Sequence, residues 1–292
     1  MVNNDKDNNT HSYILTFTCP DTVGIVAAVT GYLSDLNYFV EESAHFGDQE
    51  TGNFFSRIRF NTNGKEWSEN QFHSGFAAIC DNFSMRCEVH DSGKPVRTII
   101  MVSKHDHCLN DLLYRYRNGL LNLEVPAIIS NHPDLRSLAE WHDIPFHHIA
   151  VTPETRLQAE QQVLDMFSST NAELLILARY MQVLTDNMCE ALKGRTINIH
   201  HSFLPGFKGS RPYQQAHERG VKIIGATAHY VTPDLDEGPI IEQTIERVDH
   251  TFGVEKMIAA GRDVESITLA RAVKNHVEHR VFLNGKRTVV FR

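Results

Sequence analysis

The stretch VRTIIMVS at residues 96–103 decides the fold of the larger part of this chain. A continuous apolar run of this kind is typical of a strand that is buried on both faces of a parallel sheet. More strand-like segments follow it, separated by helical apolar spacing, at 124–131, 145–151, 172–180 and 195–200. Strands that alternate with helices predict an α/β fold with a doubly wound, mostly parallel sheet. An antiparallel-looking segment, a long helix and two short strands around an Asn-Gly turn are expected at 223–247, 252–280 and 281–291.

The first ninety residues follow a different pattern. A β-rich segment (12–19) leads into the turn CPDTVG (19–24), after which apolar side chains recur at helical spacing. Two strand-like segments, a second helical pattern and a last strand follow at 38–46, 54–60, 72–83 and 85–90. The order β-α-β-β-α-β predicts a ferredoxin-like unit.

Charge divides the chain at the same place. Residues 1–90 carry a net charge of −7 and residues 91–292 carry −1, with histidine counted as neutral. The segment DSGKP between these parts has the Gly, Ser and Pro content of a linker. We therefore expect a disordered tail (1–11), a small domain (12–90), a linker (91–95) and a second domain (96–292).

Composition disfavours several classes of protein. A net charge of −8 and a sequence pI near 6.1 provide no basic field for nucleic acid. No window reaches the ~18 uninterrupted apolar residues of a membrane span, and the polar start MVNNDKDNNTHS is unlike a signal peptide. The five cysteines form no CxxC pair, which argues against a disulfide framework and for a reducing cytoplasm.

Reactive side chains are densest in INIHHSFLPGFKGSRP (197–212) and HYVTPDLDEGPIIEQ (229–243). Asn198 and His200 lie two apart at the end of an expected strand, so their side chains point to the same side. Ligands bind at the carboxyl ends of strands in open α/β sheets. Together with Asp236 in a turn, these groups can polarise a carbonyl, move a proton and orient a water molecule.

Plainer roles exist for each of these residues. Asn198 and His200 can be polar groups that end a strand, and Asp236 can cap its turn. His200 and His201 can be metal ligands, but neighbouring residues on a strand point to opposite faces and no HxxxH or HExxH motif accompanies them. The pattern therefore favours a site without metal.

Residues 197–243 resemble the catalytic half of the folate-dependent formyltransferase family, which includes glycinamide ribonucleotide transformylase. The family's Asn-x-His, Ser-Leu-Leu-Pro-like and Asp-x-Gly-Pro-Ile blocks read here Asn198-Ile-His200, Ser202-Phe-Leu-Pro205 and Asp236-Glu-Gly-Pro-Ile240. LARYMQVL (177–184) is similar to the family's folate-pocket segment, with Gln182 in place of the usual Arg. The resemblance extends over 96–292 and implies a formyltransferase-type sheet.

The resemblance also implies roles for individual residues. Asn198, His200 and Asp236 would be catalytic, with the division of acid and base between His200 and Asp236 left open. The loop that shapes the site would contain Ser202, Pro205 and Gly209. No cofactor beyond the folate substrate, 10-formyltetrahydrofolate, and no metal are expected. The folate would be bound by Leu177, Met181, Gln182, Val183, Leu184, Thr232, Pro233, Asp234 and Leu235, although the apolar members can simply be core.

Residues 12–90 resemble the ACT domain, a regulatory module for small ligands. CPDTVGIVAAVTGYL (19–33) matches its first strand-to-helix turn, with Asp21 and Gly24 in that turn. An ACT domain before a formyltransferase fold resembles the 10-formyltetrahydrofolate deformylase family, whose members release formate and tetrahydrofolate. The resemblance implies a glycine or methionine effector and a homo-oligomer; the alternative is a purely structural module in which Asp21 and Gly24 only shape the turn.

The loop after the first long strand separates transfer from hydrolysis. In the transformylase, a Ser-Gly-x-Gly-Ser-Asn-Leu loop lets backbone N–H groups approach the acceptor's phosphate. The corresponding stretch here, SKHDHCL (103–109), has Lys104 and Asp106 at the glycine positions. A Cβ hinders close approach and Asp106 repels phosphate, so water is the expected acceptor. Other interpretations are phosphate binding by Lys104, transfer to a non-phosphorylated amine, or a silent folate or amino-acid sensor.

Overall fold

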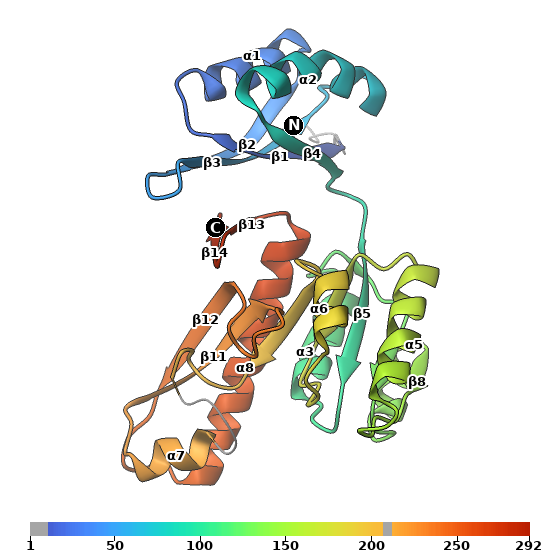
Figure 1. Cartoon of the computed structure of the whole chain (residues 1–292), viewed down its shortest axis with the longest axis vertical. Coiled ribbons are helices and arrows are strands. Elements are labelled where there is room, and N and C mark those ends of the chain that lie inside the picture. Colours follow the sequence, from blue (N-terminus) through green and yellow to red (C-terminus); the bar gives the residue numbers. More distant parts are fainter. Residues whose placement is uncertain (1–10, 207–211) are drawn as a thin grey trace, which may run out of the picture. The chain divides into compact units, whose positions relative to one another are not determined.

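The computed structural model describes residues 11–206 and 212–292. The chain forms two compact units (Figure 1). One contains Met1–Lys94, Glu278–Phe282 and Phe291–Arg292, and the other contains Pro95–Val277 and Leu283–Val290. The end of the chain therefore contributes to the first unit, whereas the sequence led us to assign all of 96–292 to the second. Of the expected tail only His11 is described, and its Nε2 lies 2.7 Å from an Asp91 carboxylate oxygen.

The first unit has the expected β-α-β-β-α-β order. Its elements are β1 (Ser12–Pro20), α1 (Ile25–Asp35), β2 (Phe39–Asp48), β3 (Asn53–Asn61), α2 (Glu69–Phe83) and β4 (Arg86–Asp91). The sheet has the strand order β2-β3-β1-β4, all antiparallel. Both helices cover one face of it (Figure 1), because Ile25, Val29 and Leu33 of α1 form a buried stripe that packs with Phe72 and Phe76 of α2.

A buried arginine explains why the chain end joins the first unit. Arg57 on β3 is 1% exposed. Its Nε donates to the carbonyl oxygen of Glu278 (2.9 Å) and its Nη1 donates to Glu42 on β2 (3.0 Å). Arg280 adds two hydrogen bonds to the same Glu42 carboxylate. A buried charge requires such partners, and Glu278 in the last part of the chain supplies one of them.

The second unit is a doubly wound α/β fold. Its sheet has the order β12-β11-β10-β9-β5-β7-β8, with β8, β7, β5, β9 and β10 parallel and β11 and β12 antiparallel. The short β6 also pairs with β5. The strands are β5 (Val96–Val102), β6 (Leu123–Glu124), β7 (Ile128–Ser130), β8 (Phe146–His148), β9 (Leu174–Leu177), β10 (Thr196–His200), β11 (Ile223–Tyr230) and β12 (Ile240–Arg247).

Helices connect these strands and cover the sheet. They are α3 (His107–Arg117), α4 (Arg136–Trp141), α5 (Arg156–Ser169), α6 (Asp186–Ala191), α7 (Pro212–Glu218) and α8 (Val254–Val277). The long α8 runs along β10, β11 and β12 and also contacts α3 (Figure 1). β13 (Val281–Asn284) and β14 (Arg287–Val290) form the expected hairpin around Asn284-Gly285. Among the described residues, no helix combines the length and the apolar character needed to span a bilayer.

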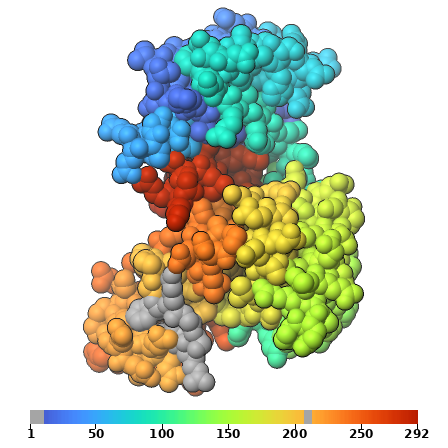
Figure 2. Space-filling model, in the orientation of Figure 1, coloured from blue at the N-terminus to red at the C-terminus, as the bar shows by residue number. Residues whose placement is uncertain are grey.

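The strand order places a ligand site. Strand β5 lies between β7 and β9, so the connections run outward in opposite directions from it. Such a reversal opens a crevice at the carboxyl ends of the strands. The yellow and orange segments that carry β9 to β12 adjoin on the surface of this unit (Figure 2). The residues that follow β5, β9 and β10 therefore lie where a ligand is expected to bind.

The structure corrects some element boundaries. The expected strand at 124–131 is two short strands, β6 and β7, with Pro126 between them, because proline has no N–H to donate to a neighbouring strand. The strand expected at 172–180 ends at Leu177. Two short helices, α6 and α7, were not expected.

Candidate active site

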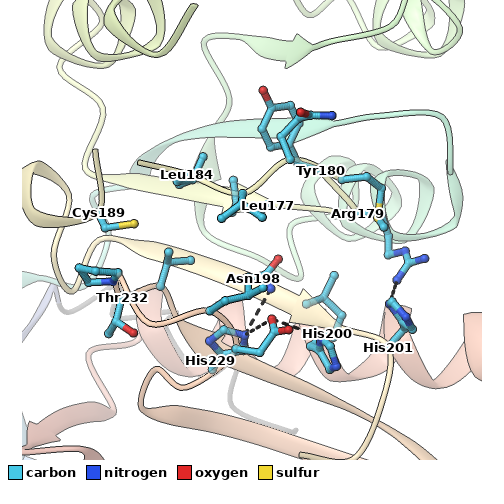
Figure 3. Close-up of a pocket in the computed structure, with 18 residues that line it drawn as sticks. Leu177, Arg179, Tyr180, Leu184, Cys189, Asn198, His200, His201, His229 and Thr232 are labelled. Atoms are coloured by element: carbon cyan, nitrogen blue, oxygen red, sulfur yellow. Dashed lines mark hydrogen bonds and ion pairs between the residues drawn. The ribbon is translucent and has the colours of Figure 1, made fainter. Parts of the chain in front are cut away.

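A pocket of about 280 Å³ opens at the carboxyl ends of β9 and β10 and beside the loop between β11 and β12. Its walls carry both apolar side chains and a cluster of imidazole, amide, carboxylate and guanidinium groups (Figure 3). Mainly apolar walls with a few converging polar groups are the usual form of a small-molecule site. This pocket is therefore a candidate site at the position that the sheet topology indicates.

The three expected catalytic residues converge on this pocket. Asn198 and His200 lie on β10 and point toward it (Figure 3). Asp236, in the loop between β11 and β12, also lines it. His200 Nδ1 is 3.2 Å from Asp236 Oδ1. His200 Nε2 is buried and has no hydrogen-bond partner in the described structure. A buried polar atom without a partner is costly, so this nitrogen marks a position where a bound molecule would be stabilised.

Asp236 is held in its ionised form. Burial opposes ionisation of this carboxyl, but the hydrogen bond from His200 and the neighbouring imidazoles lower the pKa of Asp236 below its usual value. Its backbone is left-handed, with φ 57°. The turn also depends on Gly238, where a Cβ would lie 1.7 Å from the carbonyl oxygen of Tyr230. The tight Asp-Glu-Gly turn therefore aims the carboxylate at His200.

His229 is a site residue that the sequence analysis missed. It lies opposite Asn198 in the β10–β11 pairing. Its Nδ1–H donates to the carbonyl oxygen of Tyr230 (2.9 Å), and its Nε2 then accepts from Asn198 Nδ2 (3.3 Å). Burial lowers the pKa of His229, which keeps the ring neutral. Its place in the reactive stretch HYVTPDLDEGP indicates a candidate site residue, but residue spacing does not specify the strand register that brings His229 to Asn198.

The expected folate residues line the pocket, with one exception. Leu177, Met181, Gln182, Val183, Leu184, Thr232, Pro233 and Leu235 line it. Asp234 does not line it; its carbonyl oxygen accepts from the Thr232 hydroxyl (3.1 Å) and from the Glu237 N–H (3.3 Å). Asp234 therefore shapes the loop, because its backbone closes the turn that presents Thr232 and Asp236.

Two of the expected loop residues, Ser202 and Pro205, follow β10 and do not line this pocket. The Ser202 hydroxyl donates to the carbonyl oxygen of Gly206 (2.9 Å), and the Thr227 hydroxyl donates to the carbonyl oxygen of Ser202 (2.9 Å). The Leu204–Pro205 peptide bond is cis. Gly209 lies outside the described residues. Ser202 and Pro205 therefore form the turn that ends β10.

The two adjacent histidines do not diverge. The rings of His200 and His201 stack with centroids 5.1 Å apart and an interplanar angle of 19°. The expectation of opposite faces was wrong because β10 ends at His200, so His201 does not continue the strand alternation. His201 lines the same pocket and accepts from Arg179 Nη1 at 2.5 Å.

The loop after β5 begins a buried polar cluster. Ser103 donates to Asn131 Oδ1 (2.6 Å) and accepts from the Met181 N–H (2.9 Å), while Lys104 and Asp106 are exposed. His107, Cys108 and Glu265 have ligand atoms within 4.8 Å of one another. The Glu265 carboxylate already interacts with His107, Tyr213 and Arg179. The nearby guanidinium makes the cluster a poor fit for a metal cation.

The residues expected at the ACT-type turn lie between β1 and α1. Gly24 has φ 97° and precedes α1, and its carbonyl oxygen accepts from the Ala28 N–H (2.9 Å). The Asp21 N–H donates to the carbonyl oxygen of Gly52 (2.8 Å). The left-handed backbone explains the glycine in physical terms.

Comparisons with known proteins agree with this architecture. Residues 96–273 match the family model described as Formyl transferase. Formyltetrahydrofolate deformylase from Corynebacterium sp. (strain P-1) is 49% identical over 280 residues, which cover 96% of this chain and 98% of the relative. Glycinamide ribonucleotide transformylase 1 from Symbiobacterium toebii is 28% identical with a TM-score of 0.64, and the match covers 68% of this chain and 96% of that chain.

A solved structure matches along nearly the whole chain. The crystal structure of formyltetrahydrofolate deformylase from Burkholderia mallei ATCC 23344 has a TM-score of 0.92 and 52% identity, and the match covers 97% of this chain and 100% of that chain. The chain therefore belongs to the formyltetrahydrofolate deformylase family.

Proposed function

We propose that Asn198, His200 and Asp236 hydrolyse 10-formyltetrahydrofolate to formate and tetrahydrofolate, with water in place of an amine acceptor. The observation that carries this assignment is the His200–Asp236 pair, whose Nδ1 and Oδ1 lie 3.2 Å apart while His200 Nε2 has no partner within the described residues. The formyl oxygen of the substrate is the partner that this nitrogen requires. The reaction belongs to one-carbon and purine metabolism.

Two donors stabilise the charge that develops on the formyl oxygen. His229 accepts one N–H of the Asn198 amide, which directs the second N–H toward the formyl oxygen. Protonated His200 donates to the same oxygen from Nε2, while Asp236 stabilises its imidazolium. As water adds to the formyl carbon, each preorganised donor contributes about 2.7–4 kcal/mol to lowering the barrier.

The acid and the base are divided between His200 and Asp236. Because the pKa of Asp236 is lowered, its carboxylate is the group that orients the attacking water and accepts a proton from it. His200 then gives a proton to N10 as the bond between that nitrogen and the formyl carbon breaks. The products are tetrahydrofolate and formate.

The pterin ring fits the apolar side of the pocket. Leu177 and Leu184 are buried beneath it, and Met181 and Val183 are about half exposed, so a flat ring can cover them. Backbone groups of 182–184 and 232–236 can pair with the polar edge of the ring. Arg156, which donates to the carbonyl oxygen of Val183, holds one of these segments in place.

Replacing Asp236 with Asn tests this mechanism. Formate release should fall by roughly 10²–10⁴-fold, because the amide cannot accept the proton of water. Binding of tetrahydrofolate, measured by equilibrium dialysis, should remain close to that of the unchanged chain. Asp234→Asn is the matched control, because this neighbouring carboxylate does not line the pocket. Near-normal hydrolysis by Asp236→Asn would contradict the proposal.

We further propose that the first unit binds a small amino acid, either glycine or methionine. The binding site would lie at an interface between subunits of a homo-oligomer, and the protein would be located in the cytoplasm. Gly24 and Asp21 at the β1–α1 turn support this placement, and the five free cysteines suit a reducing compartment. Calorimetric titration of the full chain with each amino acid should give saturable heat and a change in formate release. No saturable binding of either would leave the unit with a structural role.

A further inference from the structure

A buried network fixes the guanidinium of Arg179 at the end of β9. Glu265 on α8 has a 2% exposed side chain and lies 3.4 Å from Arg179 Nε. The same carboxylate accepts from the Tyr213 hydroxyl (2.7 Å) and interacts with His107 Nε2 (2.7 Å). On its other side, Arg179 Nη1 donates to His201 Nδ1. Arg179 therefore lies between Glu265 of α8 and His201, the residue that follows β10.

His201 serves this network as a neutral acceptor. Burial, together with the charges of Arg179 and His200, lowers the pKa of His201 to about 4. A neutral ring leaves Nδ1 with a lone pair, which the short contact with Arg179 requires. The arrangement does not depend on titration near neutral pH.

The backbone at Arg179 is unusual for a long side chain. Its φ is 63°, in the left-handed region that favours glycine. In the part of the chain that the structure describes, the other non-glycine residues with positive φ are Asn, Asp, Ser or His, most of which tolerate that region better. Strain of this kind persists where the surroundings over-determine it and marks functional positions. The Arg179 side chain is therefore retained at a conformational cost.

The position of Arg179 in the pocket indicates its function. Leu184, Cys189 and Thr232 lie at one end, Asn198 and His200 lie at the centre, and Arg179 and His201 lie at the opposite end (Figure 3). If folate occupies the apolar end, an acceptor must approach the formyl carbon from the other side. That side is where Arg179 and His201 form the wall.

We propose that Arg179, fixed by Glu265 and His201, closes the acceptor end of the pocket and thereby restricts the acceptor to water. The proposal rests on the hydrolysis proposed above. With water, oxygen bonds to the formyl carbon, the bond from that carbon to N10 breaks, N10 gains one proton and formate leaves with release of the other. With a primary amine, nitrogen would bond to the same carbon, N10 would gain the amine's proton, and the products would be the N-formyl amine and tetrahydrofolate.

Replacing Arg179 with Gly tests this proposal, because glycine opens the space and suits the left-handed backbone. The full-length variant would be incubated with 10-formyltetrahydrofolate and glycinamide, a small amine without phosphate. N-formylglycinamide and formate would be measured by mass spectrometry. We expect the ratio of formylated amine to formate to rise by roughly tenfold or more over the unchanged chain, and to increase with glycinamide concentration.

Three further variants distinguish the loss of side-chain volume at Arg179 from the change in charge and from the relief of backbone strain. Arg179→Lys keeps most of the volume and should keep the acceptor restricted to water. Arg179→Gly combined with Glu265→Gln also removes the carboxylate charge that faces Arg179 and should show the same rise in amine transfer. Asn171→Gly, at φ 50° away from this pocket, relieves left-handed strain alone and should leave the product ratio unchanged.

Two outcomes would overturn the proposal. In the first, Arg179→Gly hydrolyses the substrate but forms no more N-formylglycinamide than the unchanged chain. In the second, the folded variant loses both hydrolysis and transfer, which would give Arg179 a part in the reaction itself. No formate from the unchanged chain, or near-normal hydrolysis by Asp236→Asn, would instead contradict the proposed function, so the two failures are distinguishable.

Discussion

At the scale of single residues, Asp236 shows how a site combines backbone and electrostatic requirements. Its left-handed φ of 57° and the close approach at Gly238 make the Asp-Glu-Gly turn sterically specific. Its lowered pKa follows from the hydrogen bond with His200, which outweighs the effect of burial. The same turn thus places a carboxylate and keeps it ionised, as needed for a group that accepts a proton from water.

The site residues differ in how far sequence could predict them. Asn198 and His200 follow from strand alternation, and Asp236 from its motif. His229 depends on the antiparallel register between two strands, which residue spacing does not specify. Arg179 and Glu265 lie far apart in the chain and meet only because α8 packs against the sheet. Sequence patterns therefore predicted the site residues that lie within a motif, and they did not predict the site residues that meet only through tertiary packing.

At the scale of elements, continuous apolar runs predicted the buried strands well. β5 lies close to its expected range because burial on both faces gives it a continuous apolar run, and β10 lies close to its range because its polar and apolar residues alternate. The helices α6 and α7 have only six and seven residues, too few for a helical period to stand out. The hairpin β13–β14 was predicted because its Asn-Gly turn has a specific backbone preference.

The contact between β11 and α8 gives a prediction about pH. His276 on α8 is partly buried, its Nδ1 lies 2.7 Å from the Tyr230 hydroxyl, and burial lowers its pKa from 6.5 to about 4. Between these values the unfolded chain binds more protons, so the free energy of unfolding should decrease as pH falls from 6.5 to 4. The largest contribution from this residue is about 3 kcal/mol.

Urea unfolding at several pH values checks this expectation. His276→Gln can still accept a hydrogen bond from Tyr230 but cannot titrate, so the pH dependence of unfolding should be shallower in that variant. His250, which lies in a loop and is exposed, provides the matched control through His250→Gln. An identical pH dependence in His276→Gln and the unchanged chain would show that His276 does not carry the effect.

At the scale of the whole molecule, the first unit is built from both ends of the chain. Its sheet comes from the first ninety residues, but the partners of buried Arg57 include Glu278, and Glu42 also bonds Arg280. Local sequence patterns could not predict this, because contacts between residues more than 200 positions apart leave no periodic signal. The charge step near residue 90 therefore marks the division of the chain only in part.

Glu42→Gln tests this construction in the full chain. The substitution leaves Arg57 and Arg280 without their shared carboxylate, and we expect the first unit to lose about 2 kcal/mol of stability, a value reduced because Glu42 is 35% exposed.

Fluorescence of one tryptophan can follow this unit alone. The chain has two tryptophans, Trp67 and Trp141, and Trp67 lies in the first unit. In a Trp141→Phe background, the change of fluorescence with urea therefore reports on Trp67. Glu88→Gln is the control, because the Glu88 side chain is 77% exposed where it pairs with His90. It should change the free energy of unfolding by less than ~0.5 kcal/mol. If the two variants unfold at the same urea concentration, the shared carboxylate does not join the chain end to this unit energetically.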